Sequence, residues 1–191
     1  MKIELPNADI DYIDNFYSAK EALQLYYELT QSLAWREDTI RMFGKLMKVP
    51  RLQALYSDNN SSYRYSNMTL DSTPFTPALT KIKQRLGGYC QEQFNTVLAN
   101  LYRNERDSVS WHSDDESELG TNPVIASLSF GAEREFQLKH IQTKEKFSIR
   151  LASGSLLLMK GTTQHYWQHC IPKRSKSIGP RINLTFRKIC F

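Results

Sequence analysis

The sequence predicts an α+β, mainly β domain in which N-terminal helices pack on one side of an antiparallel sandwich or barrel. Two observations predict this class. Helical hydrophobic patterns occupy two segments before residue 93, and short alternating runs separated by turn residues follow it. Helices that come first and strands that come later favour segregated layers over an alternating α/β fold.

The individual elements follow from local signals. A first helix is expected over residues 18–34, because Ser18 and Glu21 have the spacing of a capping box. A second helix is expected over residues 76–88, since a Thr-Pro pair opens it and a Gly-Gly pair ends it. Strands are expected over residues 95–103, 124–130, 134–140, 146–151, 155–159 and 181–188.

Length and composition favour one domain over residues 1–191. No apolar run reaches 18 residues, and the N-terminus lacks a signal-peptide pattern. Cys90, Cys170 and Cys190 are widely spaced without a CxxC pair, so three reduced structural thiols are expected. We therefore expect a monomer in the cytoplasm, or in the nucleus of a eukaryotic cell.

Charge is distributed unevenly along the chain. Residues 134–191 hold 12 Lys/Arg and 2 Glu, whereas residues 105–133 hold 1 Arg and 7 acidic residues. An acidic stretch is expected around a cation site, and the basic loop that contains Lys173 and Lys176 has the charge to follow a phosphate backbone. The net charge of +5 is common in proteins that never bind nucleic acid.

His112-Ser-Asp114 is the first of two motifs that carry chemistry. Residues two apart on a strand share a face, so this pair and one distant His form the 2-His-1-carboxylate set that binds Fe(II). From the spacing alone, His140, His165 and His169 are all candidates for the third ligand. A single His-x-Asp pair is weak evidence of a metal site when it stands alone.

Arg181-Ile-Asn-Leu-Thr-Phe-Arg187 is the second motif. Its alternation places Arg181, Asn183, Thr185 and Arg187 on one strand face and three apolar residues on the other. Two arginines on one face suit a dicarboxylate such as 2-oxoglutarate. The alternative is an ordinary solvated strand face.

Together these motifs resemble the AlkB family of Fe(II)- and 2-oxoglutarate-dependent dioxygenases, which oxidatively remove alkyl groups from nucleic-acid bases. The resemblance extends from about residue 94 to residue 189 and is strongest to homologues that carry Trp-His-Ser-Asp-Asp-Glu. Coverage is thinner before residue 50, and the first 35 residues are not matched. The matching segments are Asn100–Glu116, Ile125–Gly131, Ser153–Met159, Trp167-Gln-His169 and Pro180–Arg187.

The resemblance implies a role for each site residue and a jelly-roll fold, the double-stranded β-helix. His112, Asp114 and His169 would be the Fe(II) ligands, which leaves His140 and His165 as surface or outer residues. Arg181 would hold the distal carboxylate of 2-oxoglutarate. Its other expected contacts are Asn100, Tyr102, Asn183, Thr185 and Arg187.

Residues 1–93 would then form the helices and the nucleotide-recognition region, and residues 94–191 the catalytic core. Asp115 falls on an acid that contacts the damaged base, and Glu116 follows in the same pattern. Tyr63 and Tyr65 fall on an aromatic segment of the base pocket. Phe43, after Met42, resembles a wedge that fills the gap left by a flipped base; the alternative is a core residue of an ordinary strand.

The expected function is oxidative repair of 1-methyladenine and 3-methylcytosine in single- or double-stranded DNA, and in RNA, with release of succinate, CO₂ and an aldehyde. Three alternatives share parts of the pattern: an oxygenase that acts on protein side chains, a non-catalytic nucleic-acid binder, and a cupin-like metalloenzyme. The acid that matches a base contact disfavours an oxygenase that acts on proteins. A non-catalytic binder would have lost a metal ligand or an arginine, and none is missing. A cupin-like enzyme would not need the paired arginines of residues 181–187.

Overall fold

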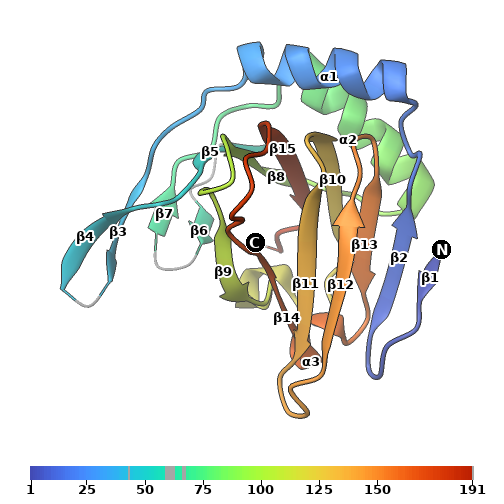
Figure 1. The fold of residues 1–191 in the computed structure, drawn as a ribbon. Helices are drawn as coiled ribbons and strands as arrows, with labels where there is room; N and C mark the ends of the chain where they lie inside the picture. Colours follow the sequence, from blue (N-terminus) through green and yellow to red (C-terminus); the bar gives the residue numbers. More distant parts are fainter. Residues whose placement is uncertain (43, 59–62, 66–67, 191) are drawn as a thin grey trace.

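Two antiparallel sheets face each other in the computed structural model, which describes residues 1–42, 44–58, 63–65 and 68–190 (Figure 1). The larger sheet has seven strands in the order β1-β2-β13-β10-β15-β8-β5. In that order its strands are β1 (Lys2–Ile3), β2 (Asp9–Ile13), β13 (Leu156–Lys160), β10 (Ile125–Gly131), β15 (Arg181–Arg187), β8 (Thr96–Tyr102) and β5 (Leu52–Ser57).

The smaller sheet has four strands in the order β12-β11-β14-β9. They are β12 (Lys146–Leu151), β11 (Arg134–His140), β14 (Trp167–Ile171) and β9 (Val109–His112). Within each of these two sheets, neighbouring strands pair antiparallel. The expected mainly β, jelly-roll architecture is therefore confirmed.

Helices α1 (Ala19–Ser32) and α2 (Pro77–Cys90) cover one side of the larger sheet, as expected (Figure 1). The capping box at Ser18 is present, since its hydroxyl accepts from the Glu21 amide and the Glu21 carboxylate accepts from the Ser18 amide. The predicted end of the second helix was wrong. Helix α2 continues through both glycines to Cys90, because the residue that adopts the terminating left-handed conformation is Gln91.

Alternation along the large sheet produces two separate apolar cores. One face of β15 contributes Ile182, Leu184 and Phe186 to the core beneath the helices. A second core lies between the sheets and includes Leu98, Leu157 and Trp167. The polar residues of β15 face the inter-sheet side, so the position of the cavity follows from the period of two.

The first 93 residues contribute more to the β structure than the sequence indicated. Strands β1, β2 and β5 of this region are members of the large sheet. Beyond residue 93, the strands β9 and β14 were also not among the predicted strands. Two hairpins complete the region: β3 (Thr39–Met42) with β4 (Lys45–Lys48), and β6 (Tyr63–Tyr65) with β7 (Met68–Leu70). Both lie to one side of the sandwich, and β3–β4 extends away from it (Figure 1).

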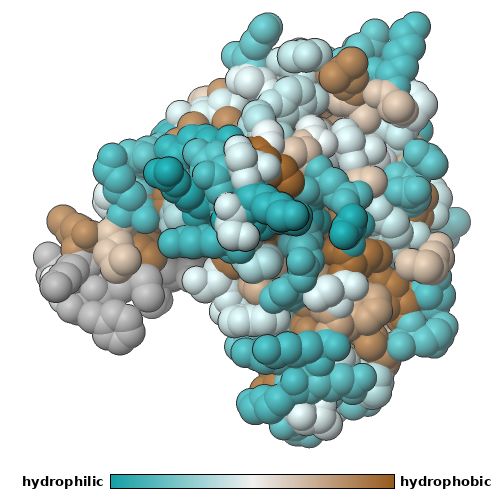
Figure 2. All heavy atoms as spheres, in the orientation of Figure 1, coloured by the Kyte–Doolittle hydropathy of each residue, from teal (hydrophilic) through white to brown (hydrophobic). Residues whose placement is uncertain are grey.

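Two short helical segments complete the description, η1 (Ser117–Leu119) and α3 (Thr163–Tyr166). None of the helices in the described part of the chain has the length and apolar character needed to cross a membrane. Polar residues cover much of the face seen in Figure 2, and hydrophobic residues also appear there at the position that β3–β4 has in Figure 1. In that hairpin Leu46 is 71% exposed and Met47 is 50% exposed.

Candidate active site

Three potential metal ligands converge between the sheets. His112 ends β9, His169 lies in β14, and the two are paired in the antiparallel register of these strands. Asp114 follows two residues later, and one potential ligand atom from each of the three residues lies within 4.8 Å of the others. We predicted that His112 and Asp114 share one face of a strand, and this detail was wrong. β9 ends at His112, so Asp114 lies beyond the strand.

Burial keeps both imidazoles in the form that binds metals. Desolvation lowers the pKa of His112, and it lowers the pKa of His169 to about 3. The Nδ1 of His112 lies 2.8 Å from the carbonyl oxygen of Ser110, a geometry in which Nδ1–H donates and the Nε2 lone pair stays available. At neutral pH both rings are therefore uncharged potential ligands.

Asp114 is held as a carboxylate although it is 1% exposed. Burial raises its pKa, but the charge of Arg187, joined at acid pH by the charges of His169 and His112, outweighs this effect and the pKa falls to about 2. The Nη2 of Arg187 donates to Asp114 Oδ1 at 2.7 Å, and both side chains are almost completely buried. A charge-assisted bond in this setting fixes one carboxylate oxygen.

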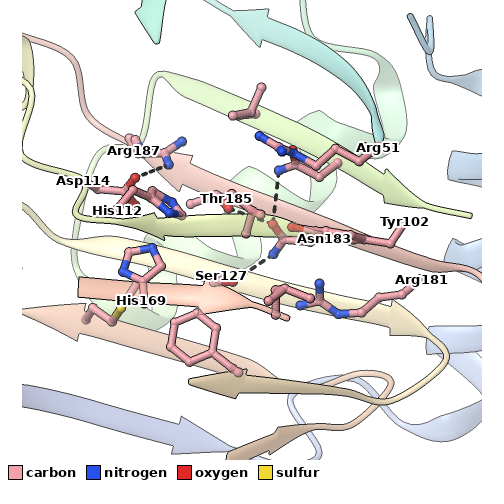
Figure 3. A pocket seen from close by; sticks show the side chains of 16 residues that line it. Arg51, Tyr102, His112, Asp114, Ser127, His169, Arg181, Asn183, Thr185 and Arg187 are labelled. Atoms are coloured by element: carbon pink, nitrogen blue, oxygen red, sulfur yellow. Dashed lines mark hydrogen bonds and ion pairs between the residues drawn. The ribbon is translucent and has the colours of Figure 1, made fainter. Parts of the chain in front are cut away.

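Arg181 lies at the other end of the same cavity, away from the imidazoles (Figure 3). It is 1% exposed, and its Nη2 donates to the hydroxyl of Ser129 at 2.9 Å. Its Nε and Nη1 have no hydrogen-bond partner among the described residues. Its guanidinium carbon also lies 5.3 Å from the centre of the Tyr102 ring. Burial lowers the pKa of Arg181 to about 10, so it remains a cation at neutral pH.

A hydrogen-bonded polar row connects the two ends of the cavity. The amide of Asn183 donates to Ser127 Oγ at 2.8 Å, and the hydroxyl of Thr185 donates to Asn183 Oδ1 at 3.0 Å. Asn100 Nδ2 donates to the same Asn183 oxygen at 3.3 Å. Because these groups hold one another, the row has a fixed geometry before any ligand enters, and the alternative of a solvated strand face is excluded.

Arg51 and the serines of β10 were missed by the sequence analysis. Arg51 is 6% exposed, lines the cavity, and donates through Nε to Asn100 Oδ1 at 2.7 Å. Ser127 and Ser129 could have been found, since they alternate with apolar residues in Ile125–Gly131. Arg51 has no such signal, because it precedes β5 in a short irregular segment.

The composition of the cavity fits the expected metal and co-substrate. Among the described residues its lining includes Arg51, Arg181 and Arg187 but a single carboxylate, Asp114. Two imidazoles and a carboxylate form the donor set that Fe(II) oxygenases use. The unpartnered nitrogens of Arg181 match a carboxylate of a small dianion, because buried donors without partners are costly.

Asp115 and Glu116, two of the residues expected to contact the base, are not among the described residues that line this cavity. Asp115 is exposed and Glu116 is half-buried, directly after the Asp114 ligand position. Tyr63 and Tyr65 form strand β6, which pairs with β7. Phe43 lies outside the described residues. The structure therefore brings together the predicted metal and co-substrate residues, and the predicted base contacts stay predictions.

The remaining histidines and the three cysteines are not among the described residues that line the cavity. His140 is buried rather than at the surface, packed against Tyr166 and Trp167. His165 is exposed and lies 3.1 Å from the Asn122 side-chain oxygen. Neither lines the cavity. The three cysteines are free thiols, as expected, but Cys190 is exposed.

Comparison with known proteins agrees with this geometry. The family model of the 2OG-Fe(II) oxygenase superfamily matches residues 9–187. The chain belongs to this superfamily. Within it, human DNA oxidative demethylase ALKBH2 is 38% identical over 198 residues, which cover 98% of this chain and 76% of that protein. A likeness of this extent also assigns the chain to the AlkB family.

Other AlkB relatives differ in length from this chain. Human alpha-ketoglutarate-dependent dioxygenase alkB homolog 3 is 41% identical over 184 residues, 91% of this chain but 64% of that protein. The chain thus spans somewhat less than two thirds of this relative. The solved structure of OsALKBH1 superimposes with a TM-score of 0.61 at 15% identity and covers 98% of this chain and 100% of that one, which supports the fold.

Proposed function

We propose that this chain is an Fe(II)- and 2-oxoglutarate-dependent dioxygenase that removes alkyl groups from nucleic-acid bases. The observation that carries the proposal is one cavity with a 2-His-1-carboxylate cluster at one end and a buried, partly unpartnered arginine at the other. The substrate class follows from the relatives, since one is named a DNA oxidative demethylase. The substrates are bases of the 1-methyladenine and 3-methylcytosine type.

His112, Asp114 and His169 would hold Fe(II). Each ring is neutral at pH 7 because burial lowers both histidine pKa values, so each offers one unprotonated nitrogen and no proton has to leave before binding. Arg187 fixes one oxygen of Asp114, which leaves the other oxygen for the metal. Three protein ligands on one side of an ion leave positions open for the reactants.

Arg181 would bind the distal carboxylate of 2-oxoglutarate. Its position opposite the ligand cluster orients the keto-acid end of this molecule toward the metal (Figure 3). Asn100, Tyr102, Asn183, Thr185 and Arg187 complete the pocket for this co-substrate. When bound, Fe(II) and 2-oxoglutarate supply, with O₂, an oxidation of the N-alkyl carbon that releases succinate, CO₂ and an aldehyde.

The base would enter beside Asp115 and Glu116. Carboxylates next to the pocket favour a base that alkylation has made cationic, because opposite charges attract most strongly where water is partly excluded. Tyr63 and Tyr65 would supply faces for stacking the extruded base. The exposed position of Asp115, directly after a ligand, is consistent with this role.

The nucleic-acid strand would lie across the hairpin β3–β4 and the basic loop. Leu46 and Met47 are largely exposed although apolar, which indicates that this hairpin does not pack into the core. Exposed Lys173 and Lys176 add positive charge that attracts phosphates. We propose that Phe43 acts as a wedge in duplex DNA.

We also propose that residues 1–191 work as one catalytic domain. The protein would act in the cytoplasm or the nucleus.

Mass spectrometry of methylated single- and double-stranded DNA and of methylated RNA tests the proposal. Each substrate is incubated with the protein, Fe(II) and 2-oxoglutarate. Loss of the methyl mass from 1-methyladenine or 3-methylcytosine in at least one substrate is expected, and only when both additions are present. Methylated bases that persist in every substrate would refute the proposed function.

A further inference from the structure

Asp114 lies where the β9–β14 ladder has already ended. The last paired residues in this direction are His112 and His169, and the chain then leaves the strand. Two side chains connect the following residues to the segment 164–167. Ser113 Oγ donates to the carbonyl oxygen of Trp167 at 3.2 Å, and the Asp114 amide donates to Gln164 Oε1 at 2.9 Å. Side-chain hydrogen bonds thus replace the ladder at the carboxylate ligand.

Gln164 is well placed to do this. It lies in α3, the short segment that leads into β14 and therefore into His169. Both Gln164 and Asp114 are 1% exposed, so water has little access to replace the bond between them. The other end of the amide is also occupied, since Nε2 contacts the sulfur of Met159 at 3.5 Å. The side chain is therefore held with its oxygen toward Asp114.

We propose that Gln164 is a positioning residue of the metal site. Arg187 fixes the carboxylate of Asp114, and Gln164 fixes its backbone, so the two contacts together determine where the free carboxylate oxygen points. Gln164 also links the two segments that carry Asp114 and His169, and it thereby sets the separation of these two ligands. The inference rests on the proposed function, because it assumes that the cluster binds Fe(II). Contacts that orient ligands contribute substantially to metal affinity.

Two nearly isosteric variants separate the hydrogen bond from the packing. Gln164→Met fills the same space without an acceptor, whereas Gln164→Glu keeps an oxygen that accepts from the Asp114 amide. Mn(II), a divalent stand-in for Fe(II), is titrated calorimetrically into the metal-free chain. We expect Gln164→Met to bind Mn(II) about tenfold more weakly than the wild type, and Gln164→Glu to remain within about threefold. Gln168→Met, the same change on β14, is the control and should match the wild type.

Equal Mn(II) affinity in Gln164→Met and the wild type would overturn the inference, as would an equal loss in both Gln164 variants. Amide hydrogen exchange of the unmutated chain gives a second test that does not depend on a folded variant. The Asp114 amide should be protected from exchange in the metal-free protein, and exchange as fast as in an exposed loop contradicts the bond. A wild-type chain that binds no Mn(II) while this amide is protected would refute the metal site itself.

Discussion

The two ends of the cavity are built in different ways. At the co-substrate end the polar residues alternate along neighbouring strands of one regular sheet, with Asn183 opposite both Asn100 on β8 and Ser129 on β10. At the metal end His112 ends β9, His169 lies in the middle of β14 and Asp114 follows β9 in a loop, and the β9–β14 register shifts between His169 and Ile171. The regular strand pairing therefore positions the polar residues at the co-substrate end, whereas individual side-chain contacts position Asp114 at the metal end.

This difference predicts different responses to substitution. The co-substrate row shares its hydrogen bonds among several side chains, so the loss of one should weaken binding by degrees. The metal end depends on three ligands and on the contacts that hold Asp114. Loss of any ligand removes both affinity and geometry, so the response there should be close to all-or-none.

The largest effect is expected at the ligands. His112→Ala, Asp114→Ala and His169→Ala should each reduce demethylation by more than the ~100-fold that loss of an outer contact costs at a metal site. Aldehyde release under saturating Fe(II) measures this. His165→Ala is the control, since this residue is exposed, and it should stay active. An active His169→Ala protein together with an inactive His165→Ala protein would show that the ligand assignment is wrong.

The next largest effect is expected on stability at Arg187. Arg187→Met leaves the buried Asp114 carboxylate without its cation, which should cost about 3–5 kcal/mol of unfolding free energy near pH 7. Because the folded pKa of Asp114 is lowered to about 2 from 3.8, its stabilising effect is present above pH 4 and is lost as the pH falls toward 2. The difference in unfolding free energy between the wild type and Arg187→Met should therefore decrease as the pH falls from 4 toward 2.

Urea unfolding of the metal-free wild-type and Arg187→Met proteins from pH 7 to pH 2 measures both the loss of unfolding free energy and its dependence on pH. Lys188→Met, at the neighbouring exposed position, serves as the control and should cost little, since exposed ion pairs contribute at most about 1 kcal/mol. A difference below 1 kcal/mol for Arg187→Met at pH 7 would mean that the Asp114–Arg187 pair does not hold the carboxylate.

A graded effect is expected at the co-substrate end. Arg181→Ala should weaken 2-oxoglutarate binding by about 2–5 kcal/mol, because it removes one partner of a buried charge pair. Mn(II) affinity should change little, since Arg181 lies at the opposite end of the cavity. Titration of each ligand separates the two effects, with Arg150→Ala on the exposed face of β12 as control. An unchanged 2-oxoglutarate affinity would contradict the proposed orientation.

The smallest effect is expected at the hairpin, outside both ends of the cavity. As a wedge, Phe43 should matter only where a base is pulled from a stacked duplex, which costs a few kcal/mol. Phe43→Ala should therefore slow repair of 1-methyladenine in double-stranded DNA about tenfold and spare single strands. Loss of both activities together with about 3–5 kcal/mol of stability would identify Phe43 as a core residue instead.

The same contrast explains what could be predicted from the sequence. The alternation of polar and apolar residues in β15 predicted which side chains line the cavity, and the capping box located the start of α1. Strand alternation predicted that Asp114 shares a face with His112, but Asp114 lies beyond the end of β9, so the family motif was the sounder basis for this residue. Arg51 has no periodic signal. Gln164 has no local signal either, because its function depends on a contact between segments fifty residues apart.

The short strands β1 and β2 were missed for a related reason. A two-residue strand and a five-residue strand carry too few positions for alternation to stand out. β2 joins the sheet through the distant strand β13, and β1 joins it only through β2. Likewise α2 passes through Gly87 and Gly88 and ends where Gln91 adopts the left-handed conformation, with the amides of Gln91 and Glu92 donating to the carbonyl oxygen of Gly87.

The most direct test is whether the oxidation of 2-oxoglutarate and the demethylation of the base are coupled during turnover. The purified chain is supplied with Fe(II), 2-oxoglutarate and an oligonucleotide that contains 3-methylcytosine, and succinate and formaldehyde are measured together. We predict equal amounts of both products, and neither in the Asp114→Ala protein. Succinate without formaldehyde on every methylated nucleic acid, or no succinate at all, would contradict the central claim that this cavity oxidises alkylated bases.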